Sequence, residues 1–552
     1  MGGAWPYDDR ASRAGRPAPF AITGALRHHR EPYATTGSRA VSSAQPTSLL
    51  FRPGDQPPAE PVGAQAAEGD LRIDELIAAL EAHGAGAGTA ALLRTPLGHP
   101  GAVRWRHEVF RDLETPALAA AIRAFGVAMD RVRADQRRAA DTRNPRERDR
   151  WRLAAIDGYG AAVEGLDGAI RAAKPAARGL VGFGAWLTDY VASAGFGRLR
   201  ADTATALAAL DEVVYRLRIG EHRIVVGPTA DEPDYGAEVR ATFARFRGAL
   251  APAPAADAFV TVDMNPVEAA ILDRVVRLDP GAFDRLAACA SAHEACVDPV
   301  VEAFEREARF CLAWLDLLAP LRRAGLGVCY PEISPDGTVR ARGCFELLTG
   351  LAGVATGRPV VTSDVDIAPA ERVVVVTGPN QGGKTTFVRA LGQLHHLAAI
   401  GCPVPAAEAS VPLVDAVRTH FDRPEGLADP GGRLETDLRH VGALVDAATA
   451  DTLVVLNDTF ASTTVADATE LLRAVLGELE ERGSRCLAVT FLDSLASRDG
   501  ATVSVAPEVD ETDPARPTYR FVRRPADGLA HARAVADRHG LGYAAVRARV
   551  GR

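Results

Sequence analysis

A glycine-bracketed turn ending in lysine and threonine is the stretch of the sequence best suited to chemistry. Gly378, Gly383, Lys384 and Thr385 fit the spacing G-x-x-x-x-G-K-[ST]. Glycines at these places let backbone N–H groups surround a phosphate, and the following helix adds unpaired N–H groups and a positive dipole end. Lys384 is expected to reach the phosphates of a nucleotide, and the Thr385 hydroxyl to bind Mg²⁺. The residues predicted to contact the nucleotide here are Gly378, Pro379, Asn380, Gln381, Gly382, Gly383, Lys384, Thr385 and Thr386.

The residues on either side of this turn support that interpretation. Val373–Val376 is a β-branched run typical of a buried strand, and 386–400 repeats apolar residues at helical spacing. Lys174 and Lys384 are the only lysines in a sequence that otherwise uses arginine. A planar guanidinium could not replace a compact ammonium inside a phosphate cradle. The alternative, a glycine-rich turn without a ligand, does not explain why strand, loop and helix follow in this order.

Three short segments carry a resemblance to a known family. The runs Thr377–Thr386, Ala399–Ala406 and Asp415–Phe421 resemble the ATPase domain of MutS-type DNA mismatch repair proteins. Gly-Pro-Asn inside the loop and Ile-Gly-x-x-Val-Pro-Ala after the helix are more specific than the phosphate-loop pattern alone. The resemblance implies an ABC-type P-loop NTPase domain of α/β fold, with ATP and Mg²⁺ as ligands. It also implies a homodimer with composite nucleotide sites, and contact with duplex DNA.

A second buried strand, Thr452–Leu456, ends at Asn457 and Asp458, where the resemblance places a Walker B element. The family usually has aspartate followed by glutamate there. Asn457 and Asp458 are therefore the predicted catalytic residues, and both join Thr385 as predicted metal residues. An amide brings no charge to Mg²⁺, and aspartate is one methylene shorter than glutamate. We expect a weak ATPase, or an Asp458 that also serves as a metal partner.

Other positions depart from the family pattern. Gly431, Gly432 and Arg433 stand where the family has the segment that closes on the partner's γ-phosphate, without the usual Ser-Thr. Gly432 and Arg433 are predicted to contact the nucleotide in trans, although a flexible loop with an incidental arginine is an equal alternative. Phe460–Thr464 stands where the family places its subunit-contacting loop but lacks the common glycines, and Phe491 stands where the family usually has a histidine that senses the γ-phosphate.

Composition limits the class of protein. The 552 residues are 47% apolar and 24% charged, as in ordinary globular proteins, and no uncharged apolar stretch of membrane-spanning length occurs. We expect a cytoplasmic protein. The formal charge of −8 argues against extensive nucleic-acid coating, although a local basic face is compatible with it. The seven cysteines indicate reduced core thiols, which also favours packing over metal binding for Cys289, His293 and Cys296.

The chain divides into a helical part and an α/β part. We expect a multidomain α plus α/β fold, in which a helical lever- and clamp-like region precedes the P-loop ATPase domain. Asn144-Pro145 should separate two long helices of an antiparallel arm, and 213–226 should form a β-hairpin. The predicted parts are a disordered extension at 1–47, a small helical segment at 48–100, the lever- and clamp-like region with its hairpin at 101–339, and the ATPase domain at 340–552.

The leading function prediction is a MutS-like, ATP-gated dimeric clamp on duplex DNA, of the mismatch repair or damage-sensing type. Its contacts should be mostly with the DNA backbone. The N-terminal mismatch-recognition domains of the family have no counterpart in the first hundred residues. A nucleotide-gated protein scaffold that does not touch DNA is the alternative, and an ATPase of the transporter or chromosome-organising class is a weaker one. The sequence leaves open the preferred DNA structure, the partner proteins, whether ATP is hydrolysed, and whether 1–47 belongs to the natural protein.

Overall fold

The computed structural model describes residues 48–55, 66–86, 88–221, 223–229, 264–379, 382–422, 432–497, 501–509, 517–525 and 539–550. These residues belong to one structural unit, Gln45–Arg552. The predictions for 1–47 and for Asn380, Gln381 and Gly431 lie outside the described residues. Within the described ranges, no helix combines the length and apolar character needed to cross a lipid bilayer.

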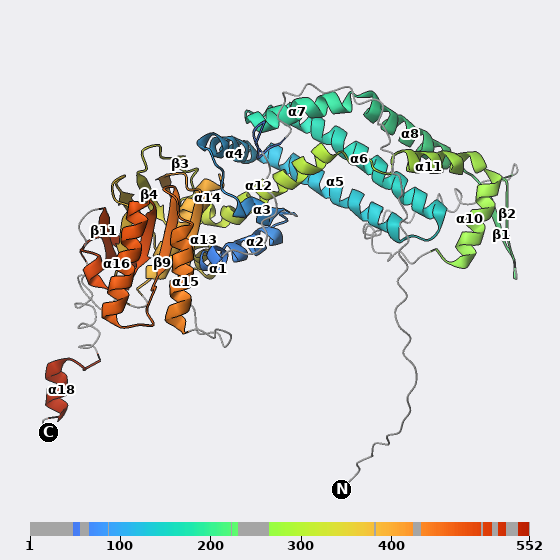
Figure 1. The fold of residues 1–552 in the computed structure, drawn as a ribbon. Helices are drawn as coiled ribbons and strands as arrows, with labels where there is room; N and C mark the ends of the chain where they lie inside the picture. The colour runs from blue at the N-terminus through green and yellow to red at the C-terminus, as the bar shows by residue number, and fades with distance from the viewer. Residues whose placement is uncertain are drawn as a thin grey trace, which may run out of the picture. The chain divides into compact units, whose positions relative to one another are not determined.

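Two long helices, α5 (Pro116–Asp141) and α6 (Pro145–Ala173), run side by side in the helical part of the chain (Figure 1). The Asn144 side chain accepts hydrogen bonds from the N–H groups of Arg146 and Glu147, and Pro145 occupies the first helical position. Both features favour a helix start at this point. The predicted break between two antiparallel helices is therefore confirmed.

The helical part continues through α7 (Arg178–Val191), α8 (Ala194–Asp211), α10 (Pro266–Leu278) and α11 (Pro280–Ala292). Between α8 and α10 the strands β1 (Arg216–Ile219) and β2 (Ile224–Gly227) pair antiparallel, with Leu217 opposite Val226. The Gly220 N–H donates to the Arg223 carbonyl across the turn. The hairpin predicted from alternating residues is thus confirmed.

Helix α12 (Pro299–Arg323) contacts both the helical part and the C-terminal part. Near its start, Phe304 stacks on Phe183 of α7 with ring centroids 3.8 Å apart. Near its end, the Trp314 indole N–H donates to the Pro403 carbonyl at 3.2 Å. Phe304 and Trp314 are both fully buried, so α12 packs against both parts through apolar side chains.

Short helices near the N-terminus pack against the C-terminal part. They are α1 (Ala66–Asp70), α2 (Ile73–Ala82), α3 (Thr89–Arg94) and α4 (Pro100–Leu113). The Thr419 hydroxyl donates to the Asp70 carboxylate at 2.7 Å, and the Gln393 amide donates to the Leu71 carbonyl at 2.9 Å. These contacts fix 66–72 against the elements that carry the predicted nucleotide site.

The C-terminal part contains two sheets. The larger has the order β12-β11-β6-β10-β9-β8, and every neighbouring pair is parallel except β11 with β12. Its strands are β6 (Val373–Val376), β8 (Ala416–Phe421), β9 (Thr452–Asn457), β10 (Arg485–Val489), β11 (Thr502–Val509) and β12 (Pro517–Arg523). The smaller has the order β3-β7-β4-β5, with β3 (Glu332–Ile333), β4 (Val339–Cys344), β5 (Ser363–Ile367) and β7 (Glu408–Val411).

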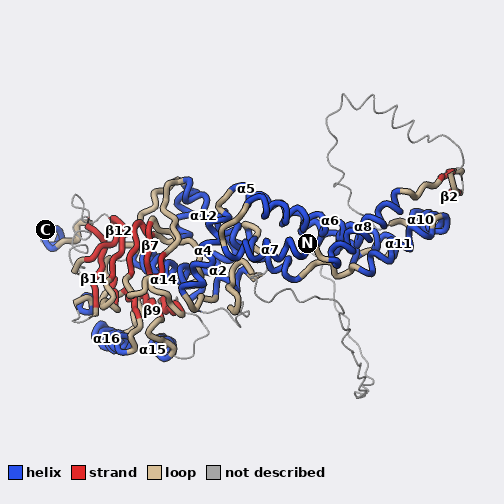
Figure 2. Tube along the Cα trace, turned by 90° about the horizontal axis from the view of Figure 1, so that it is seen from above, coloured by secondary structure: helices blue, strands red, loops and turns tan. Residues whose placement is uncertain are grey.

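Helices cover both faces of the larger sheet (Figures 1 and 2). Val373 and Val375 face α15 (Arg433–Asp446) and α16 (Val465–Glu481) in one apolar cluster, while Val374 and Val376 belong to the core that contains α14 (Lys384–Ala399). This alternation explains why all four residues of β6 are buried. The remaining elements are α13 (Leu347–Thr356), the short helix Asp493–Leu495 and α18 (Tyr543–Val550).

Candidate functional site

The glycines at both ends of the predicted phosphate loop are required by backbone shape. Gly378 has φ of 133° and Gly383 has φ of 89°, a region that disfavours side chains. A Cβ atom on Gly378 would lie 2.6 Å from Cδ of Pro507, and one on Gly383 would lie 3.2 Å from Cδ1 of Tyr519. The loop between β6 and α14 therefore depends on glycine at both positions.

Lys384 begins α14 and is almost fully buried. Its Nζ donates a hydrogen bond to the Gly378 carbonyl at 2.7 Å, which joins the two ends of the loop. Burial lowers the pKa of Lys384, and the Asp458 carboxylate opposes this shift. The only buried lysine among the described residues thus stands at the N-terminus of a sixteen-residue helix, next to a carboxylate.

The predicted metal residues come together at the carboxyl end of β9. The Thr385 hydroxyl donates to the Asn457 side-chain oxygen at 3.0 Å, so helix α14 and strand β9 are tied at this point. Hydroxyl, amide and carboxylate oxygens are the ligands that a hard cation prefers. Thr385, Asn457 and the adjacent Asp458 fit a Mg²⁺ site by their chemistry.

Asp458 follows β9 in an unusual backbone conformation. Its φ is 53°, in the left-handed region that aspartate and asparagine tolerate better than most residues. Burial raises the pKa of its carboxyl group, while Lys384 lowers it. Asp458 is half-buried and lines the same cavity as Lys384.

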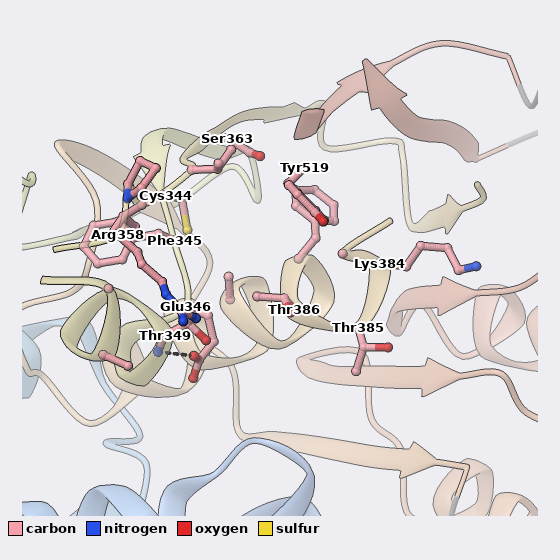
Figure 3. Close-up of a pocket in the computed structure, with 18 of the residues that line it drawn as sticks. Cys344, Phe345, Glu346, Thr349, Arg358, Ser363, Lys384, Thr385, Thr386 and Tyr519 are labelled. Carbon is pink, nitrogen blue, oxygen red and sulfur yellow. Dashed lines mark hydrogen bonds between the residues drawn. The ribbon is translucent and has the colours of Figure 1, made fainter. Parts of the chain in front are cut away.

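A cavity of about 640 Å³ lies against the loop (Figure 3). Lys384, Thr385 and Asp458 line one part of it, and residues of α13 and the segment after it line another. Figure 3 shows Lys384 and Thr385 across from Phe345 and Arg358. The volume falls within the range of small-molecule sites, which is roughly 300–1,000 Å³. Besides Asp458, five of the predicted residues line this cavity, namely Pro379, Gly383, Lys384, Thr385 and Thr386.

Several lining residues were not predicted from the sequence. Phe345, Arg358 and Val361 come from the smaller sheet and the segment around α13, and Tyr519 comes from β12, far downstream. No local pattern marks these residues, because sheet topology alone brings them to the loop. The alternation of side-chain types along 517–523 could have predicted a strand containing Tyr519. It could not have shown that this strand lies beside the phosphate loop.

Gly432 and Arg433 do not line the cavity of their own chain. Gly432 is exposed and immediately precedes α15, and the Arg433 guanidinium forms an ion pair with Asp422 at the end of β8. The predicted contact of these residues with a nucleotide in trans stays a prediction. In the segment 460–464, Phe460 is buried and the Thr464 hydroxyl caps α16.

Histidine and cysteine side chains outside the loop take part in hydrogen bonds or core packing, and the described residues hold no cluster of metal-ligating side chains. His395 and His396 are buried in α14, where their rings contact the carbonyls of Leu391 and Leu93. His293 Nε2 lies 2.9 Å from an Asp202 carboxylate oxygen. Cys289 and Cys296 are buried free thiols.

The architecture defines a class before any comparison is made. A mainly parallel sheet with helices on both faces, preceded by long helices, is a mixed helical and α/β protein. Its candidate site lies at the carboxyl ends of the strands, where α/β sheets usually bind ligands.

Comparison with known proteins places one domain of the chain among MutS sequences. Residues 374–524 match the family model MutS domain V. The chain is 32% identical to the endonuclease MutS2 of Solidesulfovibrio magneticus over 39% of its length and 28% of the relative. It is 30% identical to the DNA mismatch repair protein MutS of Azorhizobium caulinodans over 42% of its length and 25% of the relative. Residues 374–524 thus carry a domain of the MutS family, as the resemblance predicts.

A third relative is the DNA mismatch repair protein MutS of Thermus aquaticus, 31% identical over 35% of this chain and 23% of that protein. The chain thus spans about a quarter of the length of the curated relatives it matches.

Proposed function

We propose that this chain binds ATP with Mg²⁺ in the cavity beside Lys384, and that ATP binding switches its conformation. The observation that carries the proposal is the loop between β6 and α14, with Lys384, Thr385 and Asp458 lining one cavity inside a MutS domain V. The backbone N–H groups at the start of α14 and the Lys384 ammonium supply positive charge for the phosphates.

The chain's own oxygens would hold the metal ion. Thr385 and Asp458 line the cavity with a hydroxyl and a carboxylate, and Asn457, which accepts a hydrogen bond from Thr385, adds an amide oxygen beside them. Mg²⁺, when bound, neutralises phosphate charge and orients the phosphates. Asp458 is the candidate base that accepts a proton from the attacking water, because it is the carboxylate beside the loop.

Hydrolysis should be weak. Asn457 contributes no negative charge to the metal, and the Asp458 carboxylate is shorter than the glutamate that the family usually has. A misplacement of about 1 Å costs on the order of 100-fold in rate. We expect a kcat well below the usual enzyme median of about 10 s⁻¹, measured as phosphate release with saturating ATP and Mg²⁺.

Nucleotide binding can be tested with the two lysines of the chain. Lys384→Gln should abolish ATP binding measured by isothermal titration calorimetry. Lys174→Gln is the matched control, because Lys174 is exposed at the end of α6, outside the cavity. No ATP uptake by the folded wild-type protein at millimolar concentration would overturn the proposal.

Two copies of the chain are proposed to pair across the nucleotide sites. Three exposed apolar residues support this step, namely Leu438 on α15, Val465 at the start of α16 and Phe491 after β10, which are 41%, 62% and 46% exposed. Val465 and Phe491 follow the carboxyl ends of β9 and β10, the side of the sheet that carries the phosphate loop. Burying them against a second copy would remove apolar surface from water.

Duplex DNA is the proposed partner. The relatives are named DNA mismatch repair protein MutS and endonuclease MutS2, and the long helices with the β1–β2 hairpin are the proposed contact region. ATP would act by favouring one arrangement of this region over another. If duplex DNA bound equally well with and without ATP, the proposed ATP switch would be wrong.

The alternative is a nucleotide-gated scaffold that binds a protein instead of DNA. The formal charge of −8 favours it, as do helical-part arginines held in ion pairs, such as Arg133 with Glu305 and Arg152 with Glu294. Salt dependence separates the two functions, since phosphate contacts give a steep negative slope of log K against log salt.

A further inference from the structure

His420 connects two parts of the candidate site that are far apart in the sequence. It lies on the edge strand β8, is 8% exposed, and faces α15. Its Nδ1 lies 3.1 Å from the Thr459 hydroxyl, directly after Asp458, and its Nε2 lies 3.2 Å from the Asp437 carboxylate on α15. One ring therefore joins the turn after β9 to the helix that begins at Arg433.

The hydrogen bonds have a defined direction. A carboxylate accepts and cannot donate, so Nε2–H donates to Asp437, and Nδ1 accepts from the Thr459 hydroxyl. Burial lowers the pKa of His420 while Asp437 opposes that shift, which agrees with a neutral ring. Because the ring is rigid, a displacement of Thr459 must move either His420 or Asp437.

The groups around His420 connect α15 to the larger sheet through polar contacts. Asp437 and His440 face it from α15, with the His440 ring centroid 6.5 Å away, and Asp70 adds charge from α1. A second connection begins with the ion pair between Arg433 and Asp422. The backbone N–H of Asp422 in turn donates a hydrogen bond to the Asn457 carbonyl at 3.1 Å. These contacts connect α15 to Asn457 through Asp422 and, through Thr459, to the neighbouring Asp458. Asn457 and Asp458 are the residues predicted to act on Mg²⁺ and water.

We propose that His420 is a positioning residue that couples the Asp458 turn to helix α15. Through it, a nucleotide in the cavity sets the position of Gly432 and Arg433 at the start of α15. The inference rests on the proposed ATP binding. It adds a route by which the nucleotide cavity controls α15, which belongs to the surface proposed to pair with a second copy. His420 itself touches neither the loop nor the cavity.

Hydrogen–deuterium exchange with and without ATP and Mg²⁺ tests this coupling on the full chain. In the wild-type protein, ATP should slow exchange both in α14 and in α15. A coupling of the usual size corresponds to a change of roughly fivefold or more in α15. His420→Ala should keep the ATP effect in α14 and lose it in α15, because the link between the turn and α15 is removed.

Matched variants separate coupling from loss of structure. Thr459→Val removes only the hydroxyl at the other end of the link and should also abolish the ATP effect in α15. Arg439→Ala, at an exposed position of α15 whose side chain pairs with Glu435, should preserve it. A variant that merely loosens α15 would raise exchange equally with and without ATP, leaving the ratio unchanged.

The outcomes are distinct. If ATP slows exchange in wild-type α14 but not in α15, or if His420→Ala and Thr459→Val keep the ATP effect in α15, the coupling is overturned while ATP binding stands. Absence of any ATP effect in wild-type α14, together with no calorimetric binding, would instead refute the proposed function on which the inference rests.

Discussion

Asp458 shows how one backbone angle limits the chemistry available at the end of β9. Glutamate, which the family usually has at this position, lacks the short polar side chain that helps aspartate and asparagine adopt positive φ. At φ of 53°, aspartate keeps a carboxylate beside Lys384 and remains compatible with the left-handed turn. Backbone conformation thus offers a physical reason for the shorter side chain.

Asp458→Asn is therefore a clean test of the proposed base. Asparagine tolerates the same φ, so the fold and ATP affinity should be retained while hydrolysis falls by roughly 10²- to 10⁴-fold. Phosphate release and calorimetry would check both expectations. Asp458→Glu should not raise turnover, because the longer side chain has to adopt the strained angle. A large gain in hydrolysis with Glu would contradict this account of the turn.

Asn457 offers a complementary prediction about the metal. Asn457→Asp places a charge beside the Thr385 hydroxyl, which now donates to the Asn457 side-chain oxygen at 3.0 Å. A carboxylate accepts the same hydrogen bond, so the fold should be unaffected. We expect ATP binding to saturate at a lower Mg²⁺ concentration, measured by titrating Mg²⁺ at fixed ATP. An unchanged Mg²⁺ requirement would place the metal away from Asn457.

His107 should make stability depend on pH. Burial lowers the pKa of His107 to about 3, and its Nε2 has no hydrogen-bond partner among the described residues. Its unfolded pKa is near 6.5, so below that pH the unfolded state binds more protons and stability falls. The slope approaches about 1.4 kcal/mol per pH unit well below pH 6.5, so the loss between pH 6.5 and 4.5 is about 2 kcal/mol.

His107→Phe should remove this part of the pH dependence in urea unfolding curves. Phenylalanine keeps an aromatic ring in edge contact with Tyr330, 5.3 Å away between centroids. A smaller dependence remains from His395, whose pKa is lowered to about 4 by burial. If NMR shows the His107 ring of the folded protein titrating near pH 6.5, the premise is wrong.

At the scale of elements, local pattern was a good guide wherever burial alone fixed the structure. The valines of β6, the stripe of α14 and the Asn144-Pro145 break could all be predicted, because each depends on neighbouring residues. Tyr519, Phe345 and the His420 link could not, because strand order brings them together from distant segments. The φ of Asp458 left no trace in the residue pattern either.

Arg106 of α4 ties three elements together at the far end of α14. Its guanidinium donates to the carbonyls of Leu50 and Ile400, at 3.2 and 2.7 Å, and its side chain is 1% exposed. Arg106→Met would leave both carbonyls without these donors, at a cost of about 1–3 kcal/mol each. We expect the free energy of unfolding to fall by about 2–4 kcal/mol.

Arg104→Met is the control for this change, since Arg104 is exposed on the same helix. It should alter stability by no more than about 0.5 kcal/mol. Denaturation followed by circular dichroism measures both variants. If both substitutions lowered the free energy of unfolding equally, Arg106 would stabilise only α4 itself. Its hydrogen bonds to Leu50 and Ile400 would then contribute nothing measurable.

At the scale of the whole molecule, the proposed switch has to reach from the cavity to the helical part. Helix α14 carries Lys384 at its start, and its last turn leads to Ile400, which accepts from Arg106. Helix α12 contacts Pro403 at one end and Phe183 at the other. Buried contacts of this kind are a physical route for a change at the loop to reach the long helices.

The β1–β2 hairpin supplies the sharpest test of DNA contact. Arg216 and Arg218 stand on β1, and each arginine that neutralises a DNA phosphate adds about 0.9 to the slope of log K against log salt. Arg216→Gln with Arg218→Gln should therefore weaken duplex binding for every sequence and reduce the slope by about 2. Fluorescence anisotropy across a salt series, with ATP and Mg²⁺ present, measures both quantities.

Arg473→Gln on α16 with Arg482→Gln directly after its last residue provides a control of equal charge change, because α16 covers the larger sheet. If duplex binding were driven by net charge alone, both pairs of substitutions would lower the affinity and the slope equally. A loss confined to the hairpin pair would support a backbone contact at β1. If the wild-type protein showed no salt-dependent binding of duplex DNA, the alternative function as a protein-binding scaffold would be favoured. The β1–β2 hairpin would then contact a protein.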